Sequence, residues 1–227
     1  GGEMTAAGAE ADPIRLAVVT GAHPYDVLGF HSLFSDLEGV VAYVQHMDDF
    51  TSSPDEVRGG YDVVLFYTML MDTPKDEGVP WYQGTPRTAL ESLGQTEQGI
   101  CILHHALLAY PDWGVWSRLV GIEDRTFGFH LDQSIRLEIA NPVHPIIDGV
   151  QSWDMVDETY TMCGAGEDSE ILLTAEHPKS MKTIAWTRRH GKSRVFCFQS
   201  GHDDTTWANA DFRKVLGRGI RWCAQRI

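Results

Sequence analysis

Four short apolar runs recur in the first half of the chain, at residues 15–21, 40–45, 61–67 and 100–103. Each is rich in β-branched or aromatic residues and too short for a helix, which is typical of a strand buried on both faces. The stretches between the runs are long enough for crossover helices. One of them repeats apolar residues at helical spacing, namely Val27, Phe30, Leu33, Phe34 and Leu37. This alternation predicts an α/β fold with a doubly wound, mainly parallel sheet covered by helices on both faces.

The second half of the chain has a different pattern, which begins near residue 121. Extended segments separated by turns follow one another at residues 134–139, 153–162, 171–174, 183–187 and 194–199. We expect them to add β-strands at one side of the sheet. No repeat or linker interrupts residues 14–227, which we interpret as one domain. Residues 1–13 are small, polar and aperiodic, and we expect them to be disordered or left over from cloning.

Local signals add detail between the strands. Residues 53–56, Ser-Pro-Asp-Glu, have the form of a capping box that opens a short helix. Thr85 and Pro86 are typical of the start of another helix. The loop at residues 68–85 is long for a compact domain, and loops of this length often cover a functional site.

Composition excludes several classes of partner and cofactor. The net charge of −14 argues against binding to nucleic acid or to an anionic membrane. No apolar run approaches the roughly 20 residues that span a bilayer. The four cysteines lack the spacing of a metal site and are expected to be free thiols. No phosphate-binding glycine motif is present, so a nucleotide cofactor is not expected. We therefore expect no membrane partner. The sequence leaves open whether the protein forms a homo-oligomer. It also leaves the localisation open: the cytoplasm is slightly favoured over export directed by a signal segment that has been removed.

The run at residues 100–103 ends abruptly at His104 and His105, and the next residues begin a helix-like stretch. A strand that turns sharply into a helix presents the turn residue at the carboxyl edge of a parallel sheet, where ligands bind. Hydrolases hold their nucleophile in such an elbow. Adjacent residues cannot both face one pocket, so we expect one imidazole to face a ligand and the other to pack.

A second histidine follows the end of another apolar run, at His202-Asp203. A histidine there can act as a general base oriented by Asp203, and the same residues can bind a divalent metal, although a solvated turn is an alternative. In the extended segment, Asp157 or Glu158 and Tyr160 can face inward, because strand residues two apart share a face. A surface-exposed acidic strand is equally compatible with the pattern.

Two further histidines, His23 and His31, follow the first predicted strand. For both, a packed or half-exposed imidazole without a functional role is the favoured interpretation.

Several of these motifs, taken together and in this order, resemble the trehalose-utilisation (ThuA-like) family. The residues that carry the resemblance are the elbow at His104-His105, the turn at His144-Pro145, the Asp157–Tyr160 segment and Gly201-His202-Asp203. The resemblance implies a relative of the class I glutamine amidotransferases with a flavodoxin-like sheet. Those enzymes carry a nucleophilic cysteine at the elbow, where this chain has His104, and Cys101 lies three residues upstream. The resemblance therefore argues against amidotransferase chemistry, and it implies metabolism of trehalose-like disaccharides and their 3-keto derivatives.

We take as the leading hypothesis an enzyme, a hydrolase or isomerase, that acts on a sugar or 3-keto-sugar. His104 and His202 would carry out acid–base chemistry, with Glu158 or Asp203 as their partner. The residues expected to bind the carbohydrate are His31, His105, Tyr160, Trp81 and Tyr82, of which the last two would stack on a pyranose ring.

Two alternatives stay open. In the first, a divalent metal such as Zn or Mn is held by His104, His202 and Asp203, with His31 or Glu158 as a further ligand. In the second, the chain is a non-catalytic sugar-binding or regulatory module on the same fold.

Overall fold

The computed structural model describes residues 12–227, so the predicted disordered or cloning-derived segment lies outside them except for Asp12 and Pro13. The strands are β1 (Ile14–Gly21), β2 (Val40–His46), β3 (Val63–Thr68), β4 (Gly99–Leu103), β5 (Gly128–Ile139), β6 (Trp153–Thr161), β7 (Glu170–Thr174), β8 (Thr183–His190) and β9 (Ser193–Phe198). The α-helices are α1 (Val27–Ser35), α2 (Met47–Ser52), α3 (Asp55–Arg58), α4 (Pro86–Glu91), α5 (Gly114–Val120), α6 (Asp204–Trp207) and α7 (Ala210–Cys223). Two 3-10 helices, η1 (Trp81–Gln83) and η2 (His104–Leu108), complete the elements.

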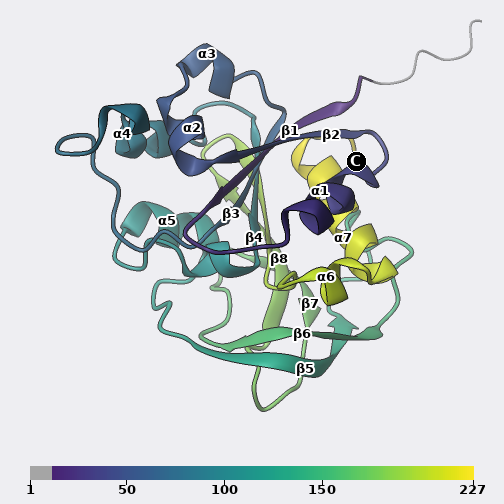
Figure 1. The fold of residues 1–227 in the computed structure, drawn as a ribbon. Coiled ribbons are helices and arrows are strands. Elements are labelled where there is room, and N and C mark those ends of the chain that lie inside the picture. Colours follow the sequence, from purple (N-terminus) through teal and green to yellow (C-terminus); the bar gives the residue numbers. More distant parts are fainter. Residues whose placement is uncertain (1–11) are drawn as a thin grey trace, which may run out of the picture.

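Within residues 12–227 the strands form a nine-stranded sheet in the order β2-β1-β3-β4-β9-β8-β7-β5-β6. Strands β2, β1, β3, β4 and β9 are parallel to one another. Helices α1 and α7 lie on one side of these strands, and α2, α4 and α5 lie on the other (Figure 1). The predicted fold class, a doubly wound parallel sheet with strands added by the C-terminal half, is confirmed.

The register of the parallel strands aligns their carboxyl ends. Gly21 of β1 lies opposite Thr68 of β3, and Leu103 of β4 lies opposite Phe198 of β9. The residues that follow these strands therefore emerge at one edge of the sheet. That edge is where open α/β sheets bind their ligands.

The remaining strands, β8, β7, β5 and β6, continue the sheet by antiparallel pairing. Strands β5 and β6 run across the lower part of the molecule in Figure 1, and a register shift between His130 and Gln133 interrupts their ladder. The hydroxyl of Thr206 and the amide of Gln199 donate to the carbonyls of Val156 and Glu158 in β6. These bonds hold β6 beside the carboxyl end of β9.

The short helix predicted at residues 53–56 is confirmed as α3, and the helix predicted to start at Thr85-Pro86 is confirmed as α4. The details of their caps, and the stretch after the elbow, differ from the prediction. Ser53 caps no helix N-terminus: it follows helix α2, and its hydroxyl donates to the Asp49 carbonyl, so the predicted capping box is wrong. Thr85 makes no side-chain cap on α4, because Asp76 from the preceding loop accepts from the backbone of Arg87 and Thr88 instead. The stretch after the elbow forms the short η2 rather than an α-helix.

Buried aromatic side chains fill the space between the sheet and its helices, among them Trp116, Trp186, Trp207 and Phe212. Three of the cysteines, Cys101, Cys197 and Cys223, are free buried thiols in this core. Among the described residues, every helix is too short or too polar to cross a lipid bilayer.

Candidate active site

His104, the first residue after β4, adopts the left-handed backbone conformation, with φ of 53°. A non-glycine residue pays roughly 1–2 kcal/mol for this conformation, and such strain concentrates at functional sites. Because Leu103 is paired with Phe198, the elbow lies beside Gln199. The Nδ1 of His104 donates to the Gln199 carbonyl at 2.6 Å. This bond fixes the ring and directs Nε2 the other way.

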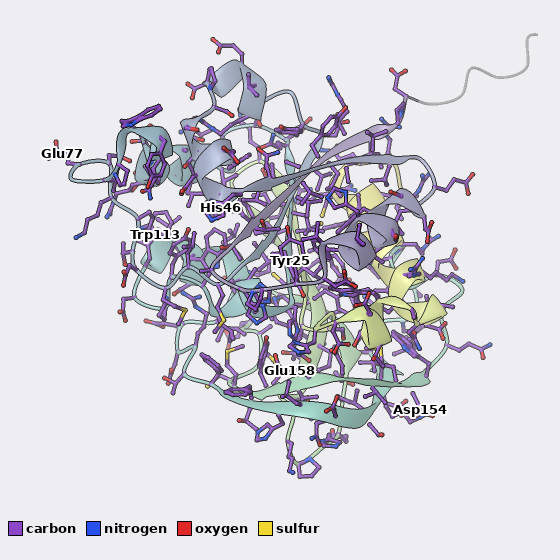
Figure 2. The ribbon with its side chains drawn as sticks, viewed as in Figure 1. Tyr25, His46, Glu77, Trp113, Asp154 and Glu158 are labelled. Carbon is purple, nitrogen blue, oxygen red and sulfur yellow. The ribbon has the colours of Figure 1, made fainter. Side chains whose placement is uncertain are left out.

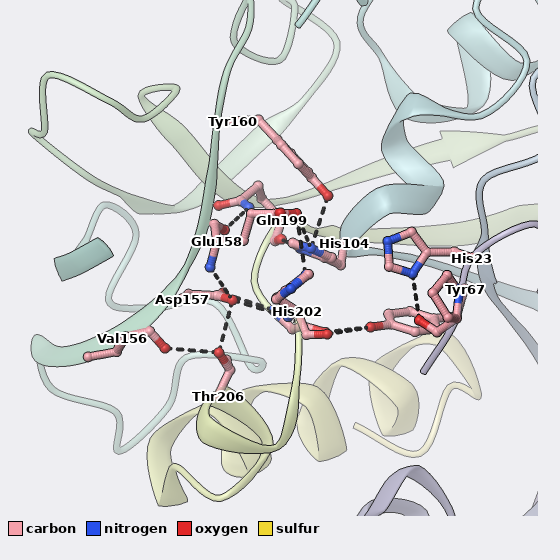
Figure 3. Close-up of polar contacts among 12 residues, drawn as sticks. His23, Tyr67, His104, Val156, Asp157, Glu158, Tyr160, Gln199, His202 and Thr206 are labelled. Atoms are coloured by element: carbon pink, nitrogen blue, oxygen red, sulfur yellow. Dashed lines mark hydrogen bonds and ion pairs between the residues drawn. The ribbon is translucent and has the colours of Figure 1, made fainter. Parts of the chain in front are cut away.

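The Nε2 atom of His104 faces two side chains of β6. It lies 3.1 Å from Glu158 Oε1 and 2.9 Å from the Tyr160 hydroxyl (Figure 3). A proton on Nε2 would be donated to the carboxylate, and without that proton Nε2 would accept from the tyrosine. The ring therefore has hydrogen-bond partners in both protonation states. The prediction that a carboxylate and Tyr160 face inward together is confirmed for Glu158.

His202 approaches the same carboxylate oxygen from the loop after β9. Its Nδ1 lies 3.4 Å from Glu158 Oε1, an ion-pair distance without hydrogen-bond alignment. The His202 side chain is 23% exposed, whereas His104 is 0% and Glu158 8% exposed. His104, Glu158 and His202 form a group called here the cluster. His202 is the member of the cluster that an incoming ligand meets first.

Glu158 and His202 shift each other's pKa values. Burial alone raises the pKa of the Glu158 carboxyl, but the interactions with both imidazoles outweigh it and hold this pKa well below its usual value. The Glu158 carboxylate in turn raises the pKa of His202, against the opposing effect of burial. Glu158 is therefore ionised, and it stabilises a protonated His202.

Asp157 faces the opposite side of β6 and holds the His202 loop. Its carboxylate accepts from Gly201 N at 2.9 Å, His202 N at 3.1 Å and the Thr206 hydroxyl at 2.9 Å. Burial raises the pKa of Asp157, and these hydrogen bonds oppose the rise. Sequence reasoning named this residue as one of a carboxylate pair and did not anticipate its positioning role.

His105 packs beside the cluster, so it is the packed one of the two adjacent histidines, and its predicted contact with a carbohydrate stays a prediction. Its ring is 1% exposed and stacks on His23, with centroids 4.1 Å apart and planes at 17°. Burial, with the neighbouring imidazoles, lowers the pKa of His105 to about 2, so this ring is neutral. His23 also stands edge-on to His202, with centroids 6.2 Å apart. The packed interpretation of His23 missed this contact, although its place after β1 was a signal.

Three ligand-type atoms converge at the centre of the cluster. One atom each from His104, Glu158 and His202 lies within 4.8 Å of the others, which is compatible with a metal ion. The carbonyl that accepts from His104 Nδ1 is the kind of partner that orients metal-bound histidines. Asp203 does not join this set: it is exposed, and its carboxylate accepts from Thr205 N at the start of α6. In the predicted donor set, Glu158 therefore takes the place of Asp203.

A comparison with protein families matches residues 38–223 to ThuA, described as trehalose utilisation. This chain belongs to the ThuA family. ThuA proteins are part of the glutamine amidotransferase-like superfamily.

Solved structures agree with this assignment at the level of the fold. A ThuA-like protein from Parabacteroides merdae is 20% identical, with a TM-score of 0.73, covering 94% of this chain and 91% of that one. One from Bacteroides uniformis is 19% identical, with a TM-score of 0.74, covering 96% and 94%. A cytoplasmic protein from Salmonella typhimurium is 14% identical, with a TM-score of 0.65, covering 92% and 99%. A comparison with curated protein sequences finds no significant match.

In this ThuA protein the elbow carries an imidazole, and Cys101 lies inside β4. Its thiol points into the core, 3.7 Å from the sulfur of Cys223, and burial raises its pKa well above the usual value. A buried thiol of this kind is not a nucleophile.

The other predicted carbohydrate-binding residues are dispersed. His31 is exposed on α1 and lines a cavity of about 470 Å³, called here the polar cavity, together with His23 and His46. Trp81 and Tyr82, in η1, are 90% and 49% exposed and contact each other, with ring centroids 5.9 Å apart. Stacking of a sugar on these two rings stays a prediction.

Proposed function

We propose that this ThuA protein is an enzyme that acts on a sugar or 3-keto-sugar by acid–base chemistry. One observation carries the proposal: His104 Nε2 and His202 Nδ1 lie 3.1 and 3.4 Å from the same oxygen of Glu158, at the ligand-binding edge of the sheet. Two imidazoles joined by one ionised carboxylate can hold and move protons close to neutral pH.

The two histidines have different roles, because His202 is partly exposed and His104 is buried. His202, the exposed ring, exchanges a proton with the substrate, and Glu158 stabilises its protonated form. His104 lies behind the carboxylate, where its Nε2 can donate a proton to Glu158 or, without that proton, accept from the Tyr160 hydroxyl. In a keto-sugar, a base removes the proton from the carbon beside the ketone and the carbonyl oxygen gains a proton, giving an enediol. No redox partner is needed for this step.

Deuterium exchange tests the proposal directly. A methyl 3-keto-glucoside incubated with the protein in deuterated buffer should lose the proton signals next to the ketone, as followed by NMR. His104→Ala and His202→Ala should abolish the exchange without changing the circular dichroism spectrum. His177→Ala, which removes an imidazole outside the cluster, is the matched control. Calorimetric binding of the keto-sugar with neither exchange nor product would instead favour a sugar-binding module.

A second candidate is a metal-dependent hydrolase or isomerase that uses the same cluster. The observation that favours it is the convergence of ligand atoms from His104, Glu158 and His202 within 4.8 Å. A bound Zn or Mn would polarise a carbonyl or activate water. Metal content should be measured on protein purified by ion exchange and then supplied with each ion. A stoichiometry near zero after that treatment would contradict this candidate.

A further inference from the structure

Two cavities, one lined mainly by polar residues and one with many apolar residues, adjoin at Ala22, next to His23. The polar cavity, of about 470 Å³, lies after the ends of β1 and β2 and is lined by Thr20, Tyr25, His31, Gln45, His46 and Asp49 with the β1–α1 loop. The second, called here the methionine cavity, is about 690 Å³ and lies where β1 and β3 end. Its apolar lining includes Met47, Met69, Leu70, Met71, Pro74 and Tyr110. Both volumes are in the range that holds small organic ligands.

The two cavities share a wall at Gly21-Ala22. Ala22 lines both of them. A Cβ atom placed on Gly21 would lie 3.3 Å from Nε2 of His46, in the polar cavity, and 3.4 Å from Cδ1 of Leu70, in the methionine cavity. Side chains crowd Gly21, but Ala22 is exposed and lines both cavities, so a single extended ligand that lies over Ala22 can occupy both spaces.

The next residue, His23, links the polar cavity to the cluster. Its ring lines the cavity, stacks on His105 and stands edge-on to His202. A hydrogen bond of 2.7 Å between its Nδ1 and the Pro24 carbonyl holds the ring in place.

The polar cavity is suited to hydroxyl groups. His46 Nδ1 accepts from Asp48 N at 3.0 Å, so the proton of the neutral ring is on Nε2, which is a donor near Gly21. Thr20 and Asp49 add a hydroxyl and a carboxylate. A sugar ring offers donors and acceptors to all three.

The methionine cavity is suited to an apolar group. Thioether side chains adapt to ligands of varied shape, and three of them line this space. Its charged side chains, Asp48, Asp72 and Lys75, are all partly or fully exposed to solvent. One wall is the loop whose tip, at Glu77, projects from the molecule in Figure 2.

We propose that the substrate is an amphiphilic glycoside, whose sugar occupies the polar cavity and whose apolar aglycone occupies the methionine cavity. This assignment rests on the proposed function, because it places the sugar beside His23, whose ring stands edge-on to the His202 ring. A disaccharide with hydroxyl groups at both ends, such as trehalose, would leave the methionine cavity without a matching partner.

Calorimetric binding tests the assignment without turnover. Phenyl β-glucoside should bind about tenfold more tightly than methyl β-glucoside or trehalose, because the aromatic ring is removed from water. Met69→Gln and Met71→Gln should reduce the affinity for the phenyl glucoside to that for the methyl glucoside, and leave the latter unchanged. Met162→Gln, at a half-buried methionine outside both cavities, is the matched control. Thermal melts should show that the variants are folded, as expected for Met71 at 39% exposure.

The binding assay tests the amphiphilic substrate separately from the proposed acid–base function. A phenyl preference that persists in His104→Ala supports the assignment even if no proton exchange is found. Equal affinities for the two glucosides, tighter binding of trehalose, or no binding of either glucoside at its solubility limit would overturn it, whatever the exchange assay shows.

Discussion

Arg125 provides a stringent test of how the elbow is held. Its side chain is buried, 3% exposed, beneath η2 and the residues after it. The guanidinium donates to the carbonyls of Leu107, at 3.0 Å, of Ala109, and of Tyr110, at 2.6 Å. Burial lowers the pKa of Arg125 to about 10, against the smaller opposing effect of the Asp112 carboxylate. The charge is therefore stabilised mainly by the backbone of the segment that follows His104.

Replacing this residue, in Arg125→Met, removes the donors to these three carbonyls and to the Ser117 hydroxyl while retaining an apolar side chain. Each buried carbonyl that loses its partner costs about 1–3 kcal/mol, so three would cost about 3–9 kcal/mol. The native state also no longer bears the desolvation of a guanidinium, so we expect a value at the low end, about 3 kcal/mol. For a chain of this size each kcal/mol corresponds to about 2–4 °C, which gives a fall in Tm of about 6–12 °C.

Urea unfolding followed by tryptophan fluorescence measures the change. Arg136→Met is the matched control, because its guanidinium forms exposed ion pairs with Glu138 and Asp154 that contribute about 0–1 kcal/mol. Arg125→Lys retains the charge and should recover only part of the loss, since an ammonium cannot reproduce the planar fork. If Arg125→Met loses no more stability than Arg136→Met, the guanidinium does not hold the elbow.

Three further predictions concern the cluster. Glu158→Gln should lower the pKa of His202 in an NMR titration. Because Glu158 raises the pKa of His202 in the folded state, the stabilisation by the Glu158–His202 pair is complete below pH of about 6.5 and is lost as the pH rises through the folded-state pKa. The stability difference between the wild type and Glu158→Gln should therefore shrink as the pH rises. A stability difference that grows as the pH rises would contradict the raised pKa of His202. His105→Phe should leave the free energy of unfolding unchanged or higher, because the His105 ring is neutral and neither of its nitrogens has an aligned hydrogen bond within the described residues. A loss above about 2 kcal/mol would show that the His105 ring does have a hydrogen-bond partner. Asp157→Asn should lose about 2–3 kcal/mol in urea unfolding, because an amide nitrogen replaces an acceptor of the Gly201 and His202 N–H groups, and unchanged stability would contradict that role.

Much of the fold could be predicted from local patterns. The apolar runs correspond to β1 through β4, and the later extended segments to β5 through β9. Burial of a strand on both faces is written in consecutive residues, so periodicity alone reveals it. The elbow was equally visible, because His104 follows the last residue of a buried strand.

Other features could not be read along the chain. His104 and Glu158 are 54 positions apart, and they meet because β4 pairs with β9 while β6 is held beside the end of β9. The sequence left Glu158 and Asp203 both open as partners of the imidazoles, and the Asp203 carboxylate, although adjacent to His202, is used by the start of α6. Adjacency in sequence was a poor guide to which carboxylate faces which ring.

The sequence by itself determined the alternation of strands and helices, the position of the elbow and the shared face of Glu158 and Tyr160, because each depends on spacing within a few residues. The tertiary structure alone decided that Glu158 bridges the two imidazoles, that His23 reaches His105 and that two cavities meet at Gly21. These contacts depend on strand order and on the packing of loops from distant parts of the chain. No local periodicity encodes that packing.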